Sequence, residues 1–189
     1  MRTPYSLSAA TAVVFLLLAT SLANAGGRFE GELQLKLVLP GDGRDFVVLA
    51  EFSYVDSAGV RWVVPRGAKT NGASVPRVAW SIVPPLAGKH LWASVLHDHY
   101  CATRERPWEA VHRVFYDALL AVGVNDVLAK VMYAAVYRFG PKWLPNGAIT
   151  RGRPISEKEA ARKLNKIRNW IEVNNPDLKQ IDKYIQGNS

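Results

Sequence analysis

The sequence predicts an α+β fold, in which a small antiparallel sheet of about three strands packs against a helical layer and a basic helical tail follows. Three features favour this fold. Residues 32–64 alternate apolar and polar side chains as half-buried strands do. Residues 90–139 contain three segments of helical character, and residues 151–189 add two amphipathic helices. A chain of 189 residues suits one ordinary domain with appendages.

Residues 1–25 have the three parts of a secretory signal peptide. Arg2 supplies the positive charge, residues 12–19 form the apolar stretch, and Ala-Asn-Ala at 23–25 is a cleavage site. The apolar stretch is too short to span a bilayer, which takes about 20 residues. We therefore expect a periplasmic or secreted bacterial protein, with an uncleaved anchor as the alternative. Residues 26–150 would form a single α+β domain, and 151–189 a C-terminal extension.

The three strands are expected at residues 33–39, 46–54 and 60–64. Turn-forming residues at 40–43 and 56–59 separate them. The next segment, residues 65–88, holds four of the chain's 11 prolines and reads as a long structured loop. Loops of this length inside a compact domain are usually functional or disordered, and the apolar residues of this one argue against disorder.

Three helices are expected at residues 90–102, 107–122 and 125–139. The first is apolar nearly all round, which places it in the core. Pro107 opens the second, while Gly123 and Gly140 follow the second and third. In the tail, Ser156 and Glu159 form a capping box, and residues 175–177 begin a further short helix.

The chain is basic, with 24 Lys and Arg against 16 Asp and Glu. Cleavage after residue 25 removes Arg2, so the mature charge is 23 − 16 = +7. Residues 151–189 account for 9 − 5 = +4 of this charge. The tail is therefore either a solvated helical pair or a surface for peripheral contact with anionic membrane. A cell-envelope polymer or envelope protein is the other expected partner. No nucleic acid is expected, since only the charge would support it.

The lone cysteine, Cys101, excludes an internal disulfide framework and a multi-cysteine zinc ribbon. In an oxidising compartment it would be either buried or paired with another chain.

His97 and Asp98 are the first candidate site, because both are ionisable and lie in the middle of the apolar helix. Burying them is costly unless each is paired or hydrogen-bonded. Neighbouring helix positions point about 100° apart, so each should find its partner elsewhere, with the 65–88 loop as the expected donor. In a functional reading His97 is a general base or metal ligand. In a structural reading the two residues hold the loop through its amides.

The loop adds Ser74, which lies between Gly72 and Pro76. Pro76 replaces the second glycine of a nucleophile elbow, so Ser74 is either a nucleophile or a turn hydroxyl. Asn71 before Gly72 favours a turn. His112 lies beside the apolar face of the second helix, as a core-edge residue or a member of the site.

A metal site is the alternative use of these histidines. His97, His99 and His112 lie on neighbouring helices, with Asp98 as a fourth ligand or an orienting group. Because His-x-His does not share one helix face, at most two of the three should converge. Our preferred assignment contains no metal, and the sequence does not decide on a cofactor.

The order of motifs resembles a known family. The motifs run VPRG, TNGASVPR, VPP, VLHDHY, VHRVFYDALLAVGV and MYAAVYRFG, over roughly residues 47–140. They are similar to an uncharacterised family of tailed-phage and bacterial proteins with a TDGASVP-like loop and an LHDY-like helix. The matching positions are Thr70, Asn71, Gly72, Ala73, Ser74, Pro76, His97, Asp98 and Tyr133.

Two positions depart from the family pattern, since Asn71 and His112 stand where aspartates are expected. If the family site binds a cation through those acids, this chain has lost two charges there. If the site is hydrolytic, His112 has a new role. The family itself implies no activity.

The sequence thus predicts an exported protein that acts as a hydrolase on a cell-envelope substrate. The alternative is a non-catalytic, phage-derived protein that binds or inhibits an envelope component. The expected catalytic residues are His97, Asp98 and Ser74, and the expected binding residues are Thr70, Asn71, Gly72 and His112.

Overall fold

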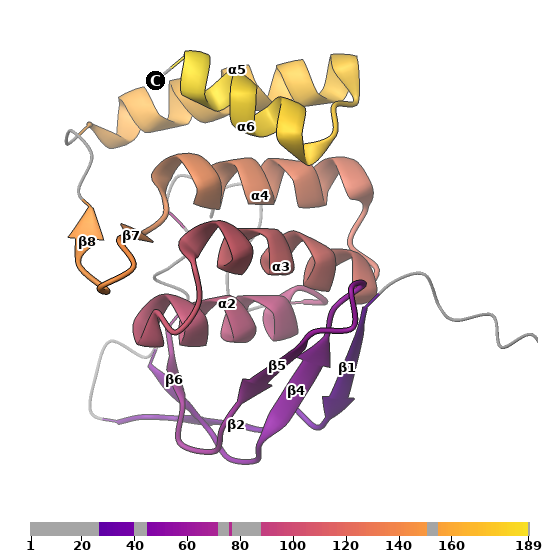
Figure 1. The fold of residues 1–189 in the computed structure, drawn as a ribbon, viewed down its shortest axis with the longest axis vertical. Helices are drawn as coiled ribbons and strands as arrows, with labels where there is room; N and C mark the ends of the chain where they lie inside the picture. The colour runs from indigo at the N-terminus through magenta and orange to yellow at the C-terminus, as the bar shows by residue number, and fades with distance from the viewer. Residues whose placement is uncertain (1–26, 40–44, 72–75, 77–87, 151–154, 189) are drawn as a thin grey trace, which may run out of the picture.

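The computed structural model describes residues 27–39, 45–71, 76, 88–150 and 155–188. Its elements are stacked in layers, with strands β1 to β6 at one end, helices α2, α3 and α4 in the middle, and α5 and α6 at the other end, while β7 and β8 lie beside the middle helices (Figure 1). The predicted α+β fold with a helical C-terminal region is confirmed. The signal peptide at 1–25 and most of the 65–88 loop, including Gly72 and Ser74, lie outside the described residues.

The strands form two three-stranded antiparallel sheets and a small hairpin. Strand order is β1-β4-β5 in the first sheet and β2-β3-β6 in the second, and β7 pairs with β8. Their bounds are β1 Arg28–Gly31, β2 Leu35–Leu37, β3 Phe46–Val48, β4 Phe52–Val55, β5 Arg61–Val64, β6 Lys69–Thr70, β7 Lys142–Trp143 and β8 Ile149–Thr150.

Aromatic side chains attach the first sheet to the helices. Tyr54 lies in the central strand, where it pairs with Phe29 of β1 and Trp62 of β5. Trp92 of α2 packs against Phe29, with ring centroids 5.0 Å apart, and against Phe52 at 5.3 Å. One face of the sheet is therefore a buried aromatic layer, and such layers contribute much of the burial energy in cores.

The prediction of a single strand at 46–54 is wrong, because residues 49–51 divide it into two strands. Its first part, β3, pairs with β2 and β6, whereas its second part, β4, pairs with β1 and β5. Val48 and Phe52 on either side of the break are both buried, so the chain passes from one sheet to the other across the core. Strands β1 and β6 were not predicted.

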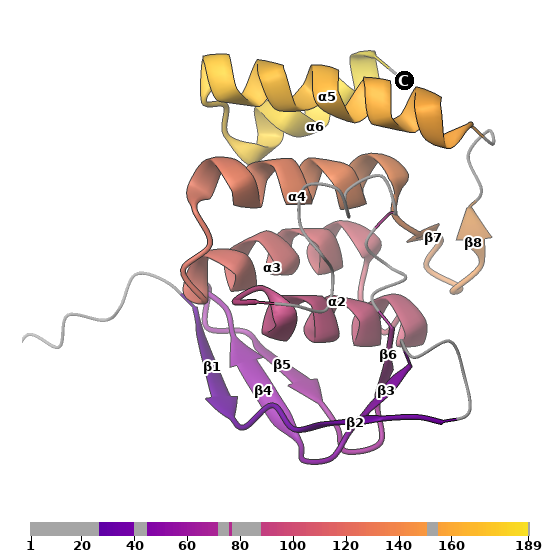
Figure 2. The same cartoon turned by 180° about the vertical axis from the view of Figure 1, so that it is seen from behind.

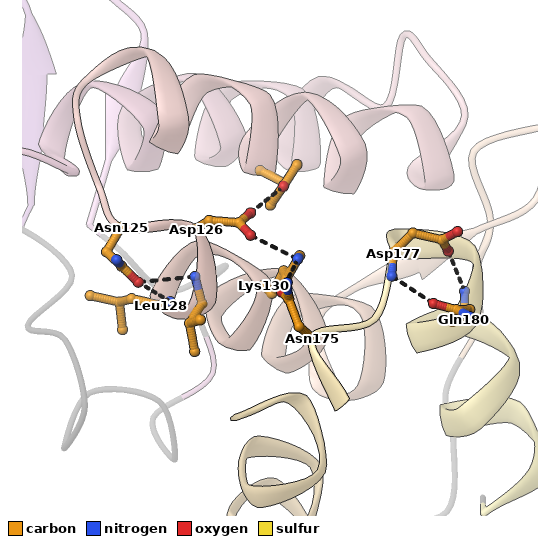
Figure 3. A network of polar contacts seen from close by, with 9 residues as sticks. Asn125, Asp126, Leu128, Lys130, Asn175, Asp177 and Gln180 are labelled. Carbon is orange, nitrogen blue, oxygen red and sulfur yellow. Dashed lines mark hydrogen bonds and ion pairs between the residues drawn. The ribbon is translucent and has the colours of Figure 1, made fainter. Parts of the chain in front are cut away.

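The helices are α2 Leu91–Thr103, α3 Trp108–Ala121, α4 Asp126–Phe139, α5 Glu157–Asn174 and α6 Leu178–Gly187. The first three begin and end within one residue of their predicted bounds. Asn125 caps α4 by accepting hydrogen bonds from the amides of Val127 and Leu128 (Figure 3). At the other end Gly140 fits because a Cβ there would lie 2.4 Å from the carbonyl oxygen of Val136.

The tail helices lie against α4 (Figure 2). Ser156 caps α5 by accepting from the Glu159 amide, and Asp177 and Gln180 form a reciprocal capping box on α6 (Figure 3). Ile171 and Ile181 are fully buried and belong to the same apolar core as α2, α3 and α4. Within the described residues, no helix combines the length and apolarity that crossing a membrane requires.

Candidate functional site

A hollow of about 540 Å³ lies where the second sheet meets α2. Lys69, Thr70 and Asn71 line it from β6 and the residue that follows, while Asp98, Cys101 and Ala102 line it from α2. The remaining described lining residues are Val38, Asp45, Phe46 and Pro141. A space of this size accommodates a ligand of several atoms with both polar and apolar walls.

Asp98 secures the sheet side of the hollow to α2. Its Oδ2 accepts hydrogen bonds from Thr70 Oγ1 at 2.6 Å and from the amide of Asn71 at 3.3 Å. The Asn71 side chain in turn donates to Asp45 at 3.2 Å. Thr70, Asn71 and Asp98 are therefore brought together, and the partners of Asp98 come from the 65–88 segment.

His97 points to a different neighbour, the histidine of α3. Its Nε2 lies 2.9 Å from Nδ1 of His112, and both residues are completely buried. One of these two facing nitrogens carries the shared proton. The ring of His97 also packs against Phe115, with centroids 4.7 Å apart. Within the described residues, His97 therefore interacts with α3, and its partner at 2.9 Å is His112.

Burial keeps both imidazoles neutral near pH 7. Loss of solvation lowers the pKa of His97 well below its usual value, and His112 lowers it further. The pKa of His112 falls to about 3, first because of burial and then because of the positive charge of Lys142, while the Pro141 backbone opposes the shift. Among the described residues, Nε2 of His112 finds no hydrogen-bond partner of ordinary geometry.

Cys101 completes this arrangement. It lies one helical turn after His97 on the same face of α2, with Sγ 3.6 Å from Nε2 and 3.8 Å from Nδ1 of that ring. One ligand-type atom from each of His97, Cys101 and His112 lies within 4.8 Å of the others. We call these three residues the His-His-Cys cluster. Cys101 was not predicted as a site residue, although its i, i+4 spacing from His97 was visible in the sequence.

The other predicted residues lie apart from this cluster. His99 projects from a different side of α2 and packs against Tyr100, with ring centroids 5.1 Å apart. Tyr133 of α4 donates to Asp182 of α6 at 2.5 Å, so it fastens the tail. Gly72 and Ser74 fall outside the described residues.

Two kinds of chemistry use the residue types of the His-His-Cys cluster. A cysteine next to a neutral imidazole can serve as a nucleophile with histidine as its base. Two imidazoles and a thiolate can instead bind a transition-metal ion. Only Cys101 belongs to both the cluster and the described wall of the hollow.

The chain is similar to proteins of unknown function. Residues 46–136 match the model of a family described as "Protein of unknown function (DUF1353)". The DUF1353 match runs from β3 into α4, so it contains Thr70, Asp98 and the whole His-His-Cys cluster. Its extent agrees with the family resemblance seen in the motifs.

Two curated relatives come from Sinorhizobium fredii (strain NBRC 101917 / NGR234). "Uncharacterized protein y4iH" is 42% identical over 106 residues, which cover 56% of this chain and 44% of the relative. "Uncharacterized protein y4jT" is 43% identical over 99 residues, which cover 52% of this chain and 30% of the relative. The chain thus spans less than half the length of these relatives. No solved structure matches it.

Proposed function

We propose that the chain is an exported hydrolase that acts on a cell-envelope substrate bound in the hollow. The observation that carries this proposal is the position of Cys101, which contacts His97 and also lines the hollow. The cluster therefore meets a space in which a ligand can bind. Buried ionisable groups beside such a space are typical of active sites.

Each part of the site has a role in this proposal. The His-His-Cys cluster provides the reactive group, and His112 orients His97 through the 2.9 Å contact. Asp98 is a positioning residue, because it holds Thr70 and Asn71 in the wall of the hollow. The signal peptide would deliver the protein to the envelope, and the mature charge of +7 favours binding to anionic polymers there.

The test uses the purified full chain, incubated separately with isolated peptidoglycan and with phospholipid vesicles. Release of soluble fragments is followed over time for the wild type, His97→Gln and His99→Gln. We expect His97→Gln to lower the rate by about 100-fold or more, as the loss of an acid–base group does. His99→Gln is the matched control on the same helix and should keep the wild-type rate. A wild type that releases nothing, or no more than His97→Gln, contradicts the proposal.

The alternative is a non-catalytic, phage-derived protein that binds or inhibits an envelope component. The complete burial of His97 and His112 favours it, because buried polar pairs are often structural. In that case a pull-down from envelope extracts should return one stoichiometric partner. His97→Gln would then lower the melting temperature without changing any reaction rate.

The tail adds a proposed peripheral contact with anionic membrane. A second hollow, of about 350 Å³, lies among α4, α5 and α6, and four cations line it: Arg138, Arg162, Lys163 and Lys166. Such a cationic surface attracts anionic headgroups. Binding to anionic vesicles should weaken as salt is added, because screening reduces this attraction. Binding that does not respond to salt contradicts the contact.

A further inference from the structure

The geometry of the His-His-Cys cluster resembles three of the four ligand positions of a tetrahedral metal site. A zinc ion bound at about 2.0–2.1 Å by nitrogen and about 2.3 Å by sulfur holds its ligands roughly 3.3 Å apart for two nitrogens and 3.6 Å for nitrogen and sulfur. The distance between His97 Nε2 and His112 Nδ1 is 2.9 Å, and that between His97 Nε2 and Cys101 Sγ is 3.6 Å. These two distances lie within a few tenths of an ångström of ligand geometry, and one ligand-type atom from each of the three residues lies within 4.8 Å of the others.

Two packed helices, α2 and α3, hold the three side chains of the His-His-Cys cluster in place. His97 and Cys101 are four residues apart on α2, so they share one helix face. His112 approaches from α3, which packs directly against α2. All three side chains are buried, and no other group of three such residues within the described ranges meets the same distance limit. Rigid helices thus hold the ligands before any ion binds, as metal sites require.

The donor set selects the kind of ion. Imidazole and thiolate ligands suit zinc and the neighbouring transition metals, whereas calcium and magnesium prefer oxygen ligands. Three protein ligands leave one position of a tetrahedral ion open, as in catalytic zinc sites. Cys101 lines the hollow, so an ion bound by this thiolate would lie next to the substrate space.

We propose that the His-His-Cys cluster binds one divalent ion of the zinc class, with His97, Cys101 and His112 as ligands and the fourth position open to the hollow. This inference deepens the proposed function, on which the catalytic use of the ion rests. The ion would bind a water molecule or a substrate oxygen at that position and polarise it.

Binding of the metal ion requires two protons to leave the ligand atoms. The Cys101 thiol releases one proton to solvent as it becomes a thiolate ligand. The proton shared by the facing nitrogens of His97 and His112 moves to an outward nitrogen, because a metal-bound nitrogen needs its lone pair. It moves to the outward nitrogen of the ring that carries it, Nδ1 of His97 or Nε2 of His112, because a neutral imidazole leaves this nitrogen unprotonated.

The test loads the chelator-treated full chain with Co²⁺, which reports tetrahedral geometry and thiolate coordination through its absorption spectrum. We expect one Co²⁺ per chain, with visible bands and a sulfur-to-cobalt charge-transfer band. Zn²⁺ should displace the cobalt, and Mg²⁺ or Ca²⁺ should not. Cys101→Ser should remove the charge-transfer band, and His112→Gln should weaken binding at least tenfold. His99→Gln, on the same helix but outside the cluster, should behave as the wild type.

A second measurement needs no variant. Zn²⁺ should slow alkylation of Cys101 in the folded wild-type chain, because a metal-bound thiolate reacts poorly. Equal alkylation rates with and without Zn²⁺, or a cobalt spectrum unchanged in Cys101→Ser, overturn the metal proposal.

The two proposals fail separately. Stoichiometric metal binding without release of envelope fragments would contradict the hydrolase and leave the metal centre in place. Hydrolysis that survives chelation and is abolished by thiol alkylation would overturn the metal centre, and would instead identify Cys101 as a nucleophile in the proposed function.

Discussion

Neighbouring residues on one helix can serve different purposes, and His97 and Asp98 do so here. Asp98 turns toward β6 and accepts from Thr70 and Asn71, whereas His97 turns toward α3 and meets His112. Their different directions follow from the roughly 100° rotation between successive helix positions. The sequence therefore shows that both need partners, but only the packing shows which partners they have.

Asp98→Ala should destabilise the fold by about 2–3 kcal/mol, because buried hydrogen bonds to a charged group are lost and Thr70 keeps an unsatisfied hydroxyl. Urea unfolding measures this change. Asp45→Ala is the matched control, since its side chain contacts the exposed end of Asn71. We expect a loss of less than about 0.5 kcal/mol for the control. Equal losses in the two variants would contradict the role given to Asp98.

Asp126 should make stability depend on pH. Burial raises its pKa, but the hydrogen bonds from Lys130 and Tyr116 and the charge of Lys130 lower it more, so the net shift is downward from 3.8 (Figure 3). A lowered pKa in the folded state means stabilisation that is complete above the unfolded pKa and is lost as the pH falls through the folded pKa. Asp126→Asn should therefore be less stable than the wild type at pH 7, and the difference should shrink below about pH 4.

Urea unfolding of both proteins across this range measures the effect of Asp126. Glu157→Gln is a control at an exposed acidic residue in the first turn of α5. A difference between wild type and Asp126→Asn that stays constant down to the acid transition would count against the assignment.

Local signals define the helices well and the strands poorly. Gly123 and Gly140 mark the ends of α3 and α4 in the sequence, and the structure keeps them. The break between β3 and β4 has no such marker, because Leu49, Ala50 and Glu51 contain neither glycine nor proline. Strand β6 has only two residues, so no period could reveal it. Tertiary pairing, and not local preference, decides these short strands.

The β4–β5 turn depends on one side chain. Asp56 accepts from the amides of Ala58 and Val60 and from the indole of Trp62. Asp56→Ala should cost about 2 kcal/mol, since these donors lose their acceptor. Tryptophan fluorescence during urea unfolding reports it. Ser57→Ala, in the same turn, leaves its backbone donor to Asp117 intact and should change stability little. A comparable loss in Ser57→Ala would contradict this account.

The core extends through all the helical layers. Ile171 of α5 and Ile181 of α6 belong to the same buried cluster as Phe115 of α3. Asp182 of α6 also pairs with Arg113 of α3 and accepts from Tyr133 of α4. Residues 151–189 were predicted as a basic extension of the domain. That description fits the charge of the tail, but its apolar face is continuous with the core of the other helices.

Removing the buried side chain of Ile171 should destabilise the whole molecule and not the tail alone. Ile171→Ala should cost about 2–5 kcal/mol, the usual range for a buried isoleucine. Val173→Ala is the matched control, because its side chain is 83% exposed. Both proteins should unfold in one transition when helicity and tryptophan fluorescence are compared. Two separate transitions in the wild type would show that the tail unfolds independently.

The site was predictable in part. Ionisable residues in an apolar helix identified His97 and Asp98 as candidates, and the adjacency of two helices allowed His97 and His112 to meet. The i, i+4 spacing of Cys101 from His97 was visible in the sequence, but the sequence does not show that this helix face meets His112. Only the packing of α2 on α3 distinguishes Cys101 and His112 from His99.

The break at residues 49–51 has a consequence for how such proteins diversify. Phe46 of β3 and Thr70 of β6 contribute to the wall of the hollow, but the His-His-Cys cluster lies on α2 and α3. A residue gained or lost at the break would reposition the strand side of that wall relative to the first sheet, while the packing of α2 on α3 would still hold the cluster together. Changes at the break could thus alter what fits into the hollow without rebuilding the His-His-Cys cluster.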